Sequence, residues 1–319
     1  MQQAREWSRA EVWRRKLLYP AHTLPTAAAP VAVALGLAIR DGVGDPVAAL
    51  FALLAGWLIQ VGGVLTDNYE NLVREPQDAE HPELVRALRG GTLTLAGLRN
   101  AILACYAAAL LAGLYLVAHA GIGVLAIGVL AVAASVAYSA GPFPLGRHAL
   151  GDPLFFLFFG IVSVVGAYYV QAAPFHGATF GSWLVADALA PAALLLGIPL
   201  GALTTNILII DDIRDRGFDV VKGKRTIAVR WGARASRVEF LALLALAYLV
   251  PFGLWLAGGL GAGALLPLLT LPYAVSTAHD VLMRDGYEAL LPATPKAGRL
   301  LLAYSLLLAA GIASQAFYR

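Results

Sequence analysis

Long apolar runs separated by shorter polar segments dominate the hydropathy pattern of this chain. Most runs contain about 20 residues, the length that an α-helix needs to cross the hydrocarbon core of a bilayer. We therefore predict an all-α membrane protein with about nine transmembrane helices. The predicted spans cover roughly residues 22–40, 46–66, 96–118, 121–139, 153–173, 183–210, 236–257, 260–279 and 297–317, and Pro191 and Pro199 interrupt the sixth.

The composition supports the same interpretation. Of the 319 residues, 59% are hydrophobic and 13% are charged, and the mean hydropathy is +0.72. A soluble globular protein carries about 25% charged residues. The net charge of +3 and the isoelectric point near 9.0 are weak evidence for nucleic-acid binding, because Lys and Arg in membrane proteins usually mark cytoplasmic loops. We expect the lipid bilayer as a partner and no nucleic acid.

The distribution of basic residues predicts how the spans are oriented. If the N-terminus is cytoplasmic, all but two of the 23 Lys and Arg residues fall in cytoplasmic segments, the exceptions being Arg40 and Arg319. Cytoplasmic loops of membrane proteins carry such an excess. The asymmetry predicts a cytoplasmic N-terminus and places two acidic segments on the cytoplasmic face.

The more informative acidic segment follows the apolar run that ends at Ile210. If the helix continues, Asp211, Asp215 and Asp219 lie at i, i+4 and i+8 and share one face. Three like charges on one face repel each other, so the pattern favours a bound cation, and Mg²⁺ prefers carboxylate oxygens. The next residues include basic side chains of the kind that bind phosphate oxygens. These are Lys222, Lys224 and Arg225.

The other acidic segment follows the apolar run that ends near residue 66. On a continuing helix its oxygen-bearing side chains share one face at i, i+4, i+8 and i+11. They are Asp67, Asn71, Glu75 and Asp78. Taken alone, this segment also fits an ordinary solvated charge run. Two such segments on one membrane face favour a functional site for both.

We therefore interpret the two segments as one site for Mg²⁺ and a diphosphate. The candidate metal ligands are Asp67, Asn71, Asp78, Asp211, Asp215 and Asp219. The candidate catalytic residues are Asp67, Asn71, Asp215 and Asp219. Oxygen ligands on both sides of a prenyl diphosphate would hold Mg²⁺ on the leaving group while an allylic C–O bond breaks. The apolar helices would accept the prenyl tail and exclude water from the carbocation.

The chain is expected to form one domain over residues 1–319. Each acidic segment ends an apolar run and precedes basic residues, which suggests a duplication of residues 22–140 and 153–279. The identity between these halves is low, so the duplication is a hypothesis.

Several separate blocks of the sequence carry a family resemblance. They are His22–Pro25, Ala29–Val31, Asp67–Asp78, Arg86–Thr94, Tyr138–Pro144, Leu150–Asp152, Phe155–Gly160, Tyr168–Gln171, Ile213–Asp215, Asp219 and Gly223–Arg230. In this order they resemble the UbiA superfamily of membrane prenyltransferases, most of all the branch that prenylates 1,4-dihydroxy-2-naphthoate in menaquinone or phylloquinone biosynthesis.

The resemblance implies a helical bundle around a central cavity, dependence on Mg²⁺, and a prenyl diphosphate held between the two acidic segments. It also implies that an aromatic acceptor, in this branch dihydroxynaphthoate, attacks the allylic cation and loses its carboxylate as CO₂. A bacterial inner membrane, with the active site on its cytoplasmic side, is the expected location.

Three further residues are candidates for contacts with the diphosphate or the acceptor. Arg86 belongs to the block that follows the first acidic segment. Arg147 either holds the acceptor carboxylate or anchors its loop at the membrane interface. Tyr138 either contacts the site or packs against neighbouring helices.

One departure from the family pattern concerns the first acidic segment. The family usually has Asn-Asp-x-x-Asp, whereas this chain has Asp67-Asn68-Tyr69-Glu70-Asn71. An amide ligates a metal through its oxygen but supplies no charge. The carboxylates of Asp67, Glu70, Glu75 and Asp78 would compensate for the missing charge.

Two other classes of protein fit the same features. One is a membrane terpene cyclase on the same scaffold, in which the carbocation is captured by its own tail. The other is a non-catalytic homologue that binds prenyl diphosphates or quinones. A transporter is disfavoured because the ionisable residues cluster at one membrane face rather than at mid-membrane.

Overall fold

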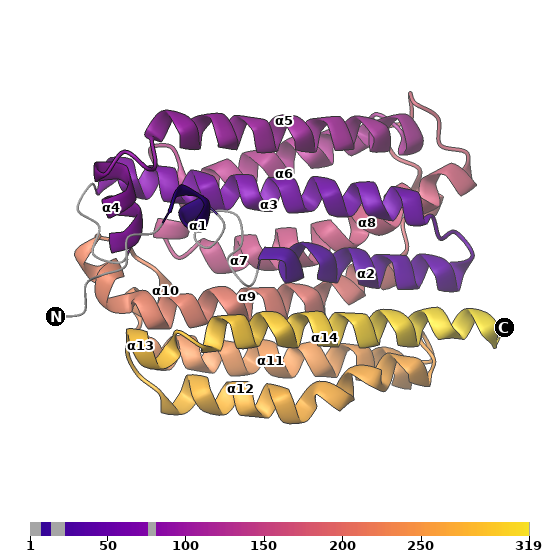
Figure 1. Cartoon of the computed structure of the whole chain (residues 1–319). Helices are drawn as coiled ribbons and strands as arrows, with labels where there is room; N and C mark the ends of the chain where they lie inside the picture. The colour runs from indigo at the N-terminus through magenta and orange to yellow at the C-terminus, as the bar shows by residue number, and fades with distance from the viewer. Residues whose placement is uncertain (1–7, 14–22, 76–80, 319) are drawn as a thin grey trace.

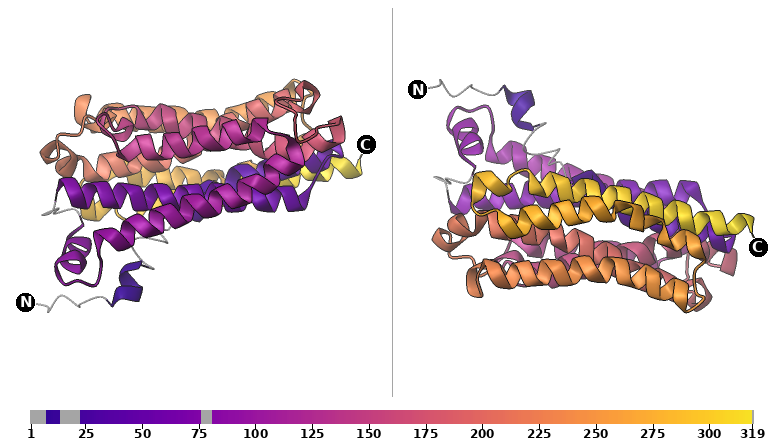
Figure 2. Two further views of the ribbon diagram at one scale, coloured as in Figure 1. Left: turned by 90° about the horizontal axis from the view of Figure 1, so that it is seen from above. Right: turned by 90° about the horizontal axis from the view of Figure 1, so that it is seen from below.

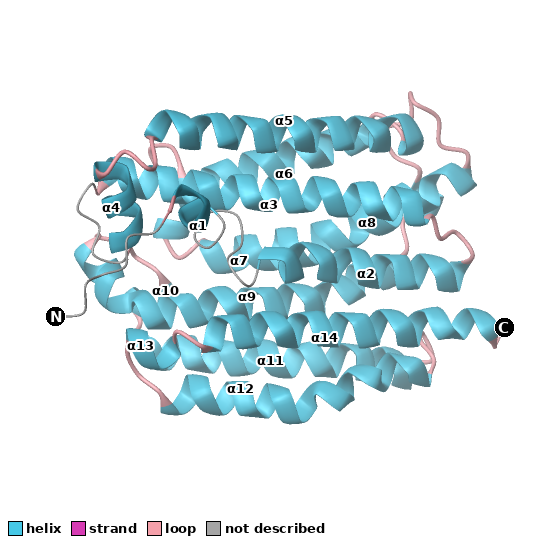
Figure 3. Cartoon of the chain, viewed as in Figure 1, coloured by secondary structure: helices cyan, strands magenta, loops and turns pink. Residues whose placement is uncertain are grey.

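The protein is a bundle of helices in the computed structural model, which describes residues 8–13, 23–75 and 81–318. Helices supply all the regular structure of this described part, and no strand occurs in it (Figure 3). The all-α prediction is confirmed. Figures 1 and 2 show from three directions that the long helices lie lengthwise along one another.

The long helices are α2 (Thr23–Asp41), α3 (Pro46–Arg74), α5 (Leu95–Ala120), α6 (Gly123–Ser139), α8 (Ser163–Ala172), α9 (Pro191–Val221), α11 (Ala233–Leu256), α12 (Leu271–Met283) and α14 (Ala293–Ala313). The short ones are α1 (Arg9–Val12), α4 (Pro82–Arg89), α7 (Gly151–Phe155), α10 (Ile227–Arg230) and α13 (Tyr287–Leu290). A π-helix, η3 (Phe156–Val162), joins α7 to α8. The 3₁₀ helices include η2 (Leu145–Arg147), η5 (Ala186–Ala188) and η6 (Ala262–Thr270).

One end of the bundle carries α4, α10 and α13, on the left in Figure 1. We call this end the mouth. The C-terminal end of α14 lies at the opposite end of the bundle.

Seven helical segments of the described chain are long and apolar enough to cross a membrane. Helix α6 is a shorter apolar helix, and the predicted span at residues 260–279 consists of η6 followed by α12. The membrane-protein prediction is confirmed, while the number of crossings stays a prediction.

Helices α3 and α9 both extend beyond their predicted spans, but only the second acidic segment is helical throughout. The predicted helical position of Glu75 is therefore wrong. Helix α3 ends at Arg74, and Glu75 is its C-cap because residues before a proline avoid helical geometry and Pro76 follows. Helix α9 runs to Val221 without a break at the buried Pro199. The predicted interruption at Pro199 is therefore wrong, and Pro191 is the first residue of the helix, a position that suits proline.

A glycine-lined crossing joins the π-helix η3 to α9. A Cβ atom on Gly160 would lie 2.5 Å from both the Gly197 carbonyl oxygen and the Gly201 Cα atom. Small residues let helix backbones approach closely inside a membrane. The crossing holds α9, which carries the second acidic segment, against the wall formed by η3.

Substitution of Gly160 by alanine is expected to destabilise the protein by about 1–3 kcal/mol, because the added methyl group overpacks this crossing. Thermal unfolding of the detergent-solubilised protein measures the effect. Gly253→Ala is the matched control, since a Cβ atom there meets nothing within 4 Å. Equal unfolding midpoints for the two variants would contradict this description of the crossing.

Candidate active site

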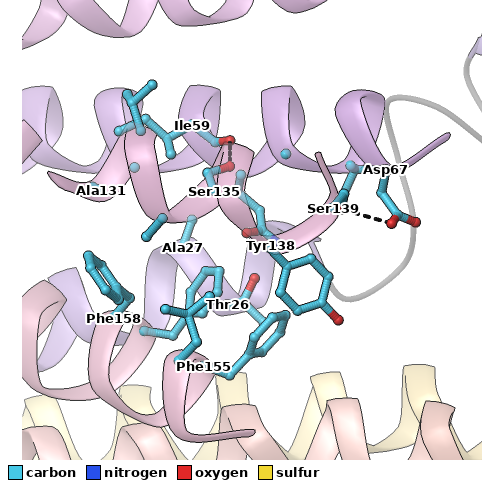
Figure 4. A pocket seen from close by; sticks show the side chains of 18 of the residues that line it. Thr26, Ala27, Ile59, Asp67, Ala131, Ser135, Tyr138, Ser139, Phe155 and Phe158 are labelled. Atoms are coloured by element: carbon cyan, nitrogen blue, oxygen red, sulfur yellow. Dashed lines mark hydrogen bonds between the residues drawn. The ribbon is translucent and has the colours of Figure 1, made fainter. Parts of the chain in front are cut away.

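A cavity of about 1060 Å³ runs from the mouth into the bundle. Helices α2, α3, α5, α6, α8 and α9 contribute to its wall, together with η3. Polar side chains line it where α3 and α9 end, and apolar side chains line most of the remainder. Figure 4 shows part of this wall, with Tyr138, Phe155 and Phe158 around the space.

The last turns of α3 bring Asp67 and Asn71 to the cavity. The Asp67 carboxylate accepts a hydrogen bond from Ser139 Oγ at 2.8 Å, as Figure 4 shows. Asn71 Nδ2 donates to the other oxygen of Asp67 at 3.1 Å. These two residues are one helical turn apart, as the sequence pattern predicts, and the Asn71 amide takes the place of a second carboxylate.

Asp211, Asp215 and Asp219 line the same cavity from α9. Asp215 is 6% exposed and Asp219 is 1% exposed, whereas Asp211 is half-buried. The continuation of α9 past Ile210 is therefore confirmed. The cavity brings the acidic face of α9 and that of α3 to one space.

Arg214 is the main site residue that our reasoning from the sequence missed. Its guanidinium donates to Asp215 through Nε at 2.6 Å and through Nη2 at 2.5 Å. Nη1 donates to Asp211 at 2.5 Å and to Thr294 Oγ1 of α14 at 3.0 Å. Arg214 therefore joins two of the four carboxylates of α9. Its spacing of three residues from Asp211 was the available signal, since such helical neighbours pair.

The turn that ends α9 directs the Lys224 side chain toward the cavity. Gly223 has a φ of +66°, and Lys224 N donates to the Asp219 carbonyl oxygen at 2.9 Å. Gly223 N donates to Val220 O at 3.2 Å, which completes a Schellman turn. This turn places Lys224 Nζ 2.7 Å from the Asp219 carboxylate, where it lines the cavity.

Arg147 lines the cavity from η2 and ties three segments together. Its Nη2 atom donates to Glu75 Oε1 at 2.8 Å and to the Lys222 carbonyl oxygen at 3.0 Å. Its own carbonyl oxygen accepts from Arg225 N at 2.7 Å. Arg147 therefore bridges the ends of α3 and α9 at the mouth.

The remaining candidates lie in different surroundings. Tyr138 lines the cavity with its ring 5.4 Å from that of Phe155. Lys222 lines a second cavity, and its Nζ atom lies 3.6 Å from Glu75 Oε2. Arg225 is exposed, and so is Arg86, which lies on α4. Asp78, like His22 of the first matching block, lies outside the described residues.

The chemistry of the donors at the mouth fits a divalent cation. Four carboxylates and an amide oxygen are hard oxygen ligands of the kind that Mg²⁺ prefers. Within residues 8–13, 23–75 and 81–318, no group of three or more His, Cys, Asp or Glu side chains is gathered closely enough to hold an ion. The cations of Arg214 and Lys224 instead lie against the carboxylates of α9.

Replacing Asn71 by aspartate is expected to place two carboxylates in direct contact, where they repel unless a cation lies between them. The variant should unfold at a lower temperature without Mg²⁺ and should bind Mg²⁺ about tenfold more tightly than the parent. A Mg²⁺ titration of the thermal unfolding midpoint measures both effects. Asn100→Asp is the control, because Asn100 is exposed on α5 and does not line the cavity. An Asn71→Asp curve that matches this control would refute the expectation.

The site consists of paired acidic helix ends beside basic side chains and an apolar cavity, a combination that suits a substrate with an anionic head and an apolar tail. The UbiA prenyltransferase family model matches residues 27–290. The chain therefore belongs to the UbiA prenyltransferase family, and it is a prenyltransferase.

Individual relatives agree with this assignment. The chain is 31% identical over 313 residues to a 1,4-dihydroxy-2-naphthoate octaprenyltransferase of Escherichia coli K12, a match that covers 96% of each protein. Among solved structures, a UbiA homologue from Aeropyrum pernix K1 superposes with a TM-score of 0.68 at 19% identity, covering 90% of this chain and 96% of that one. A UbiA homologue from Archaeoglobus fulgidus bound to GPP and Mg²⁺ has a TM-score of 0.61 at 14% identity, covering 92% and 98%.

Proposed function

We propose that the protein transfers a prenyl group from a prenyl diphosphate to 1,4-dihydroxy-2-naphthoate, with Mg²⁺ and with loss of CO₂, in menaquinone-type quinone biosynthesis. One observation carries the proposal. A single cavity has carboxylate-bearing helix ends at its mouth and an apolar wall beyond them. The name of the Escherichia coli relative supports the choice of acceptor.

In this proposal the mouth binds the diphosphate. Asp67, Asn71 and three of the four aspartates of α9, namely Asp211, Asp215 and Asp219, would hold Mg²⁺, which when bound neutralises the charge of a leaving diphosphate. Lys224 lines the same space, and its ammonium group suits diphosphate oxygens that the metal does not reach. The Archaeoglobus fulgidus homologue bound to GPP and Mg²⁺ supports this pairing of ligands.

The apolar wall would receive the prenyl tail. Phe155, Phe158 and Phe159 line it, together with Gly56 and Gly63 on the cavity face of α3. Such a wall keeps water from an allylic cation, which water would otherwise capture. Bulky aromatic rings on one side and glycines on the other leave an extended tail room to lie along α3.

The allylic C–O bond breaks and its electron pair leaves with the diphosphate. The ring carbon that bears the carboxylate forms the new C–C bond with a π pair of the electron-rich ring. The ring carboxylate then leaves as CO₂, and the electron pair of its C–C bond restores the aromatic ring. We assign to Arg147 the binding of the acceptor carboxylate before this step, because its guanidinium lines the cavity at the mouth.

We also propose that the mouth faces the cytoplasm of a bacterium, across its inner membrane. The excess of Lys and Arg on the loops at this end supports that orientation. A duplication of residues 22–140 and 153–279 remains our hypothesis, supported by the acidic segments that end α3 and α9 at the same end of the bundle.

Product analysis tests the proposal. The purified protein in detergent is incubated with Mg²⁺, farnesyl or geranylgeranyl diphosphate, and dihydroxynaphthoate, and the products are identified by mass spectrometry. We expect a prenylated naphthoquinol that lacks the acceptor carboxylate. A hydrocarbon or terpene alcohol that forms equally well without acceptor would replace the proposal with a terpene cyclase, and no turnover of any donor would favour a binding protein.

A further inference from the structure

Arg214 occupies the place on α9 where a metal cation would neutralise the acidic face. Its guanidinium makes three hydrogen bonds to Asp211 and Asp215, all between 2.5 and 2.6 Å. Thr294 Oγ1 donates to the same Asp211 oxygen at 2.5 Å, which fixes that carboxylate from α14. A guanidinium fork that meets a carboxylate through two parallel bonds is among the strongest of side-chain ion pairs.

The same carboxylates serve the proposed metal site, so the two cations compete. An Asp211 or Asp215 oxygen that accepts a short hydrogen bond from Arg214 cannot ligate a metal through the same lone pair. Lys224 lies in the same way against Asp219. The chain's own Arg214 and Lys224 therefore pair with the carboxylates of Asp211, Asp215 and Asp219.

Open space adjoins the Arg214 side chain on two sides. This side chain lines both the main cavity and a second cavity at the mouth, which Arg216, Phe218 and Lys222 also line. Its guanidinium lies 5.7 Å from the ring of Tyr287, which faces both cavities too. A rotation of one long side chain would carry the positive charge away from the carboxylates without moving α9.

We propose that Arg214 is an internal counter-ion for the metal site. When metal and donor bind, its guanidinium leaves the carboxylates of Asp211 and Asp215 and pairs with the diphosphate of the donor. The proposal rests on the proposed function for the identity of the donor. Before loading, Arg214 keeps the acidic face neutral and opposes metal binding. On loading, the metal takes Asp211 and Asp215, and the freed guanidinium binds the anionic head of the donor. Metal and donor then bind cooperatively, each tightening the other by the same factor.

Metal binding without turnover tests the proposal. Mn²⁺ replaces Mg²⁺ as a probe, and its free and bound forms are distinguished by electron paramagnetic resonance on the full-length protein in detergent. The donor probe is geranyl S-thiolodiphosphate, whose C–S bond resists ionisation. For the wild-type protein we expect this probe to tighten Mn²⁺ binding by at least about tenfold. Mn²⁺ binding that is equally tight with and without the probe would overturn the proposal.

Two variants separate Arg214 from the general charge of the mouth. Arg214→Gln should bind Mn²⁺ at least about tenfold more tightly than wild type when no donor is present, because the competing ion pair is gone. The gain from the donor probe should shrink in the same variant. Arg234→Gln removes the same charge from an exposed side chain of α11 that lines neither cavity, and should behave as wild type.

The two proposals fail in different ways. If prenyl transfer is absent but Arg214→Gln binds Mn²⁺ more tightly, the proposed function is wrong and the counter-ion stands. If transfer occurs but Arg214→Gln and Arg234→Gln bind Mn²⁺ alike, the counter-ion proposal is wrong. If Arg214→Gln does not fold, Arg214→Lys replaces it, because lysine keeps the charge but cannot form the bidentate ion pair. Without the donor probe, Arg214→Lys should bind Mn²⁺ more tightly than wild type does without the probe and less tightly than wild type does with it. Binding no tighter than wild type without the probe would overturn the proposal.

Discussion

Replacing Asp215 by asparagine is expected to lower kcat for prenyl transfer by about 10²–10³-fold, the loss typical when one preorganised electrostatic group is removed from an active site. The substitution keeps the shape of the side chain and removes its charge. Asp215 is 6% exposed, lines the cavity and holds Arg214 through two hydrogen bonds. The variant therefore loses a candidate metal ligand and releases the guanidinium at the same time.

The control for this variant is Asp187→Asn. Asp187 lies in η5, is exposed and does not line the cavity. Steady-state rates at saturating donor and acceptor, measured over a range of Mg²⁺ concentrations, compare the two proteins. An Asp215→Asn enzyme whose kcat stays within a factor of two of the control would show that the carboxylate has no part in the chemical step.

Replacing Gly56 by tryptophan is expected to shift the donor preference of the enzyme toward prenyl diphosphates with short tails. Gly56 lies on the cavity face of α3, eleven residues before Asp67 and therefore about 16 Å farther along the helix. A Cβ atom on Gly56 meets nothing within 4 Å, so the indole would extend into open space of the cavity. A tail longer than this distance then has to displace the ring or bend away from it.

We expect kcat/KM for geranylgeranyl diphosphate to fall at least about tenfold relative to that for dimethylallyl diphosphate, as overpacking of an apolar site typically costs about 1–3 kcal/mol. Competition between the two donors in one reaction measures the ratio directly. Gly253→Trp is the control, because Gly253 also has open space around it but lies on α11, away from the cavity. An unchanged donor ratio in Gly56→Trp would mean that the tail does not lie along α3.

The sequence predicted the acidic faces because they depend on local geometry alone. Once a helix continues, residues at i, i+4 and i+8 must share a face, and neither Asp67–Asn71 nor Asp211–Asp219 contains a proline to stop it. Hydropathy located the helices for a similar reason, since the thickness of a bilayer sets their length. Family resemblance supplied the class of enzyme, which the residue pattern alone left open.

The sequence could not predict which basic residues reach the cavity. That outcome depends on the Schellman turn at Gly223, which directs Lys224 to Asp219 and leaves Arg225 exposed. Arg147 contacts Glu75, which is distant in the sequence, and Arg214 contacts Thr294 in the same way. Contacts of this kind follow from the packing of helices far apart in the chain, for which one sequence carries no local signal.

The irregular helices could not be predicted from the sequence for a related reason. An apolar run such as Phe155–Gly160 predicts a span but does not distinguish an α-helix from the π-helix η3. The close approach of Gly160 to α9 depends on that local geometry and on Gly197 and Gly201, which belong to another helix. Pro199 does not interrupt α9, because a buried membrane helix tolerates a proline where neighbouring groups form hydrogen bonds with the freed backbone atoms.

The central claim is that this cavity joins a prenyl group to an aromatic acid with release of diphosphate and CO₂. The most direct measurement uses dihydroxynaphthoate labelled with ¹³C in its carboxyl group and follows ¹³CO₂, diphosphate and prenylated product in one reaction. The account predicts that the three appear in equal amounts and that all three form about 10²–10³-fold more slowly in Asp215→Asn. Diphosphate released without ¹³CO₂, or a product that keeps the labelled carboxylate, would contradict it.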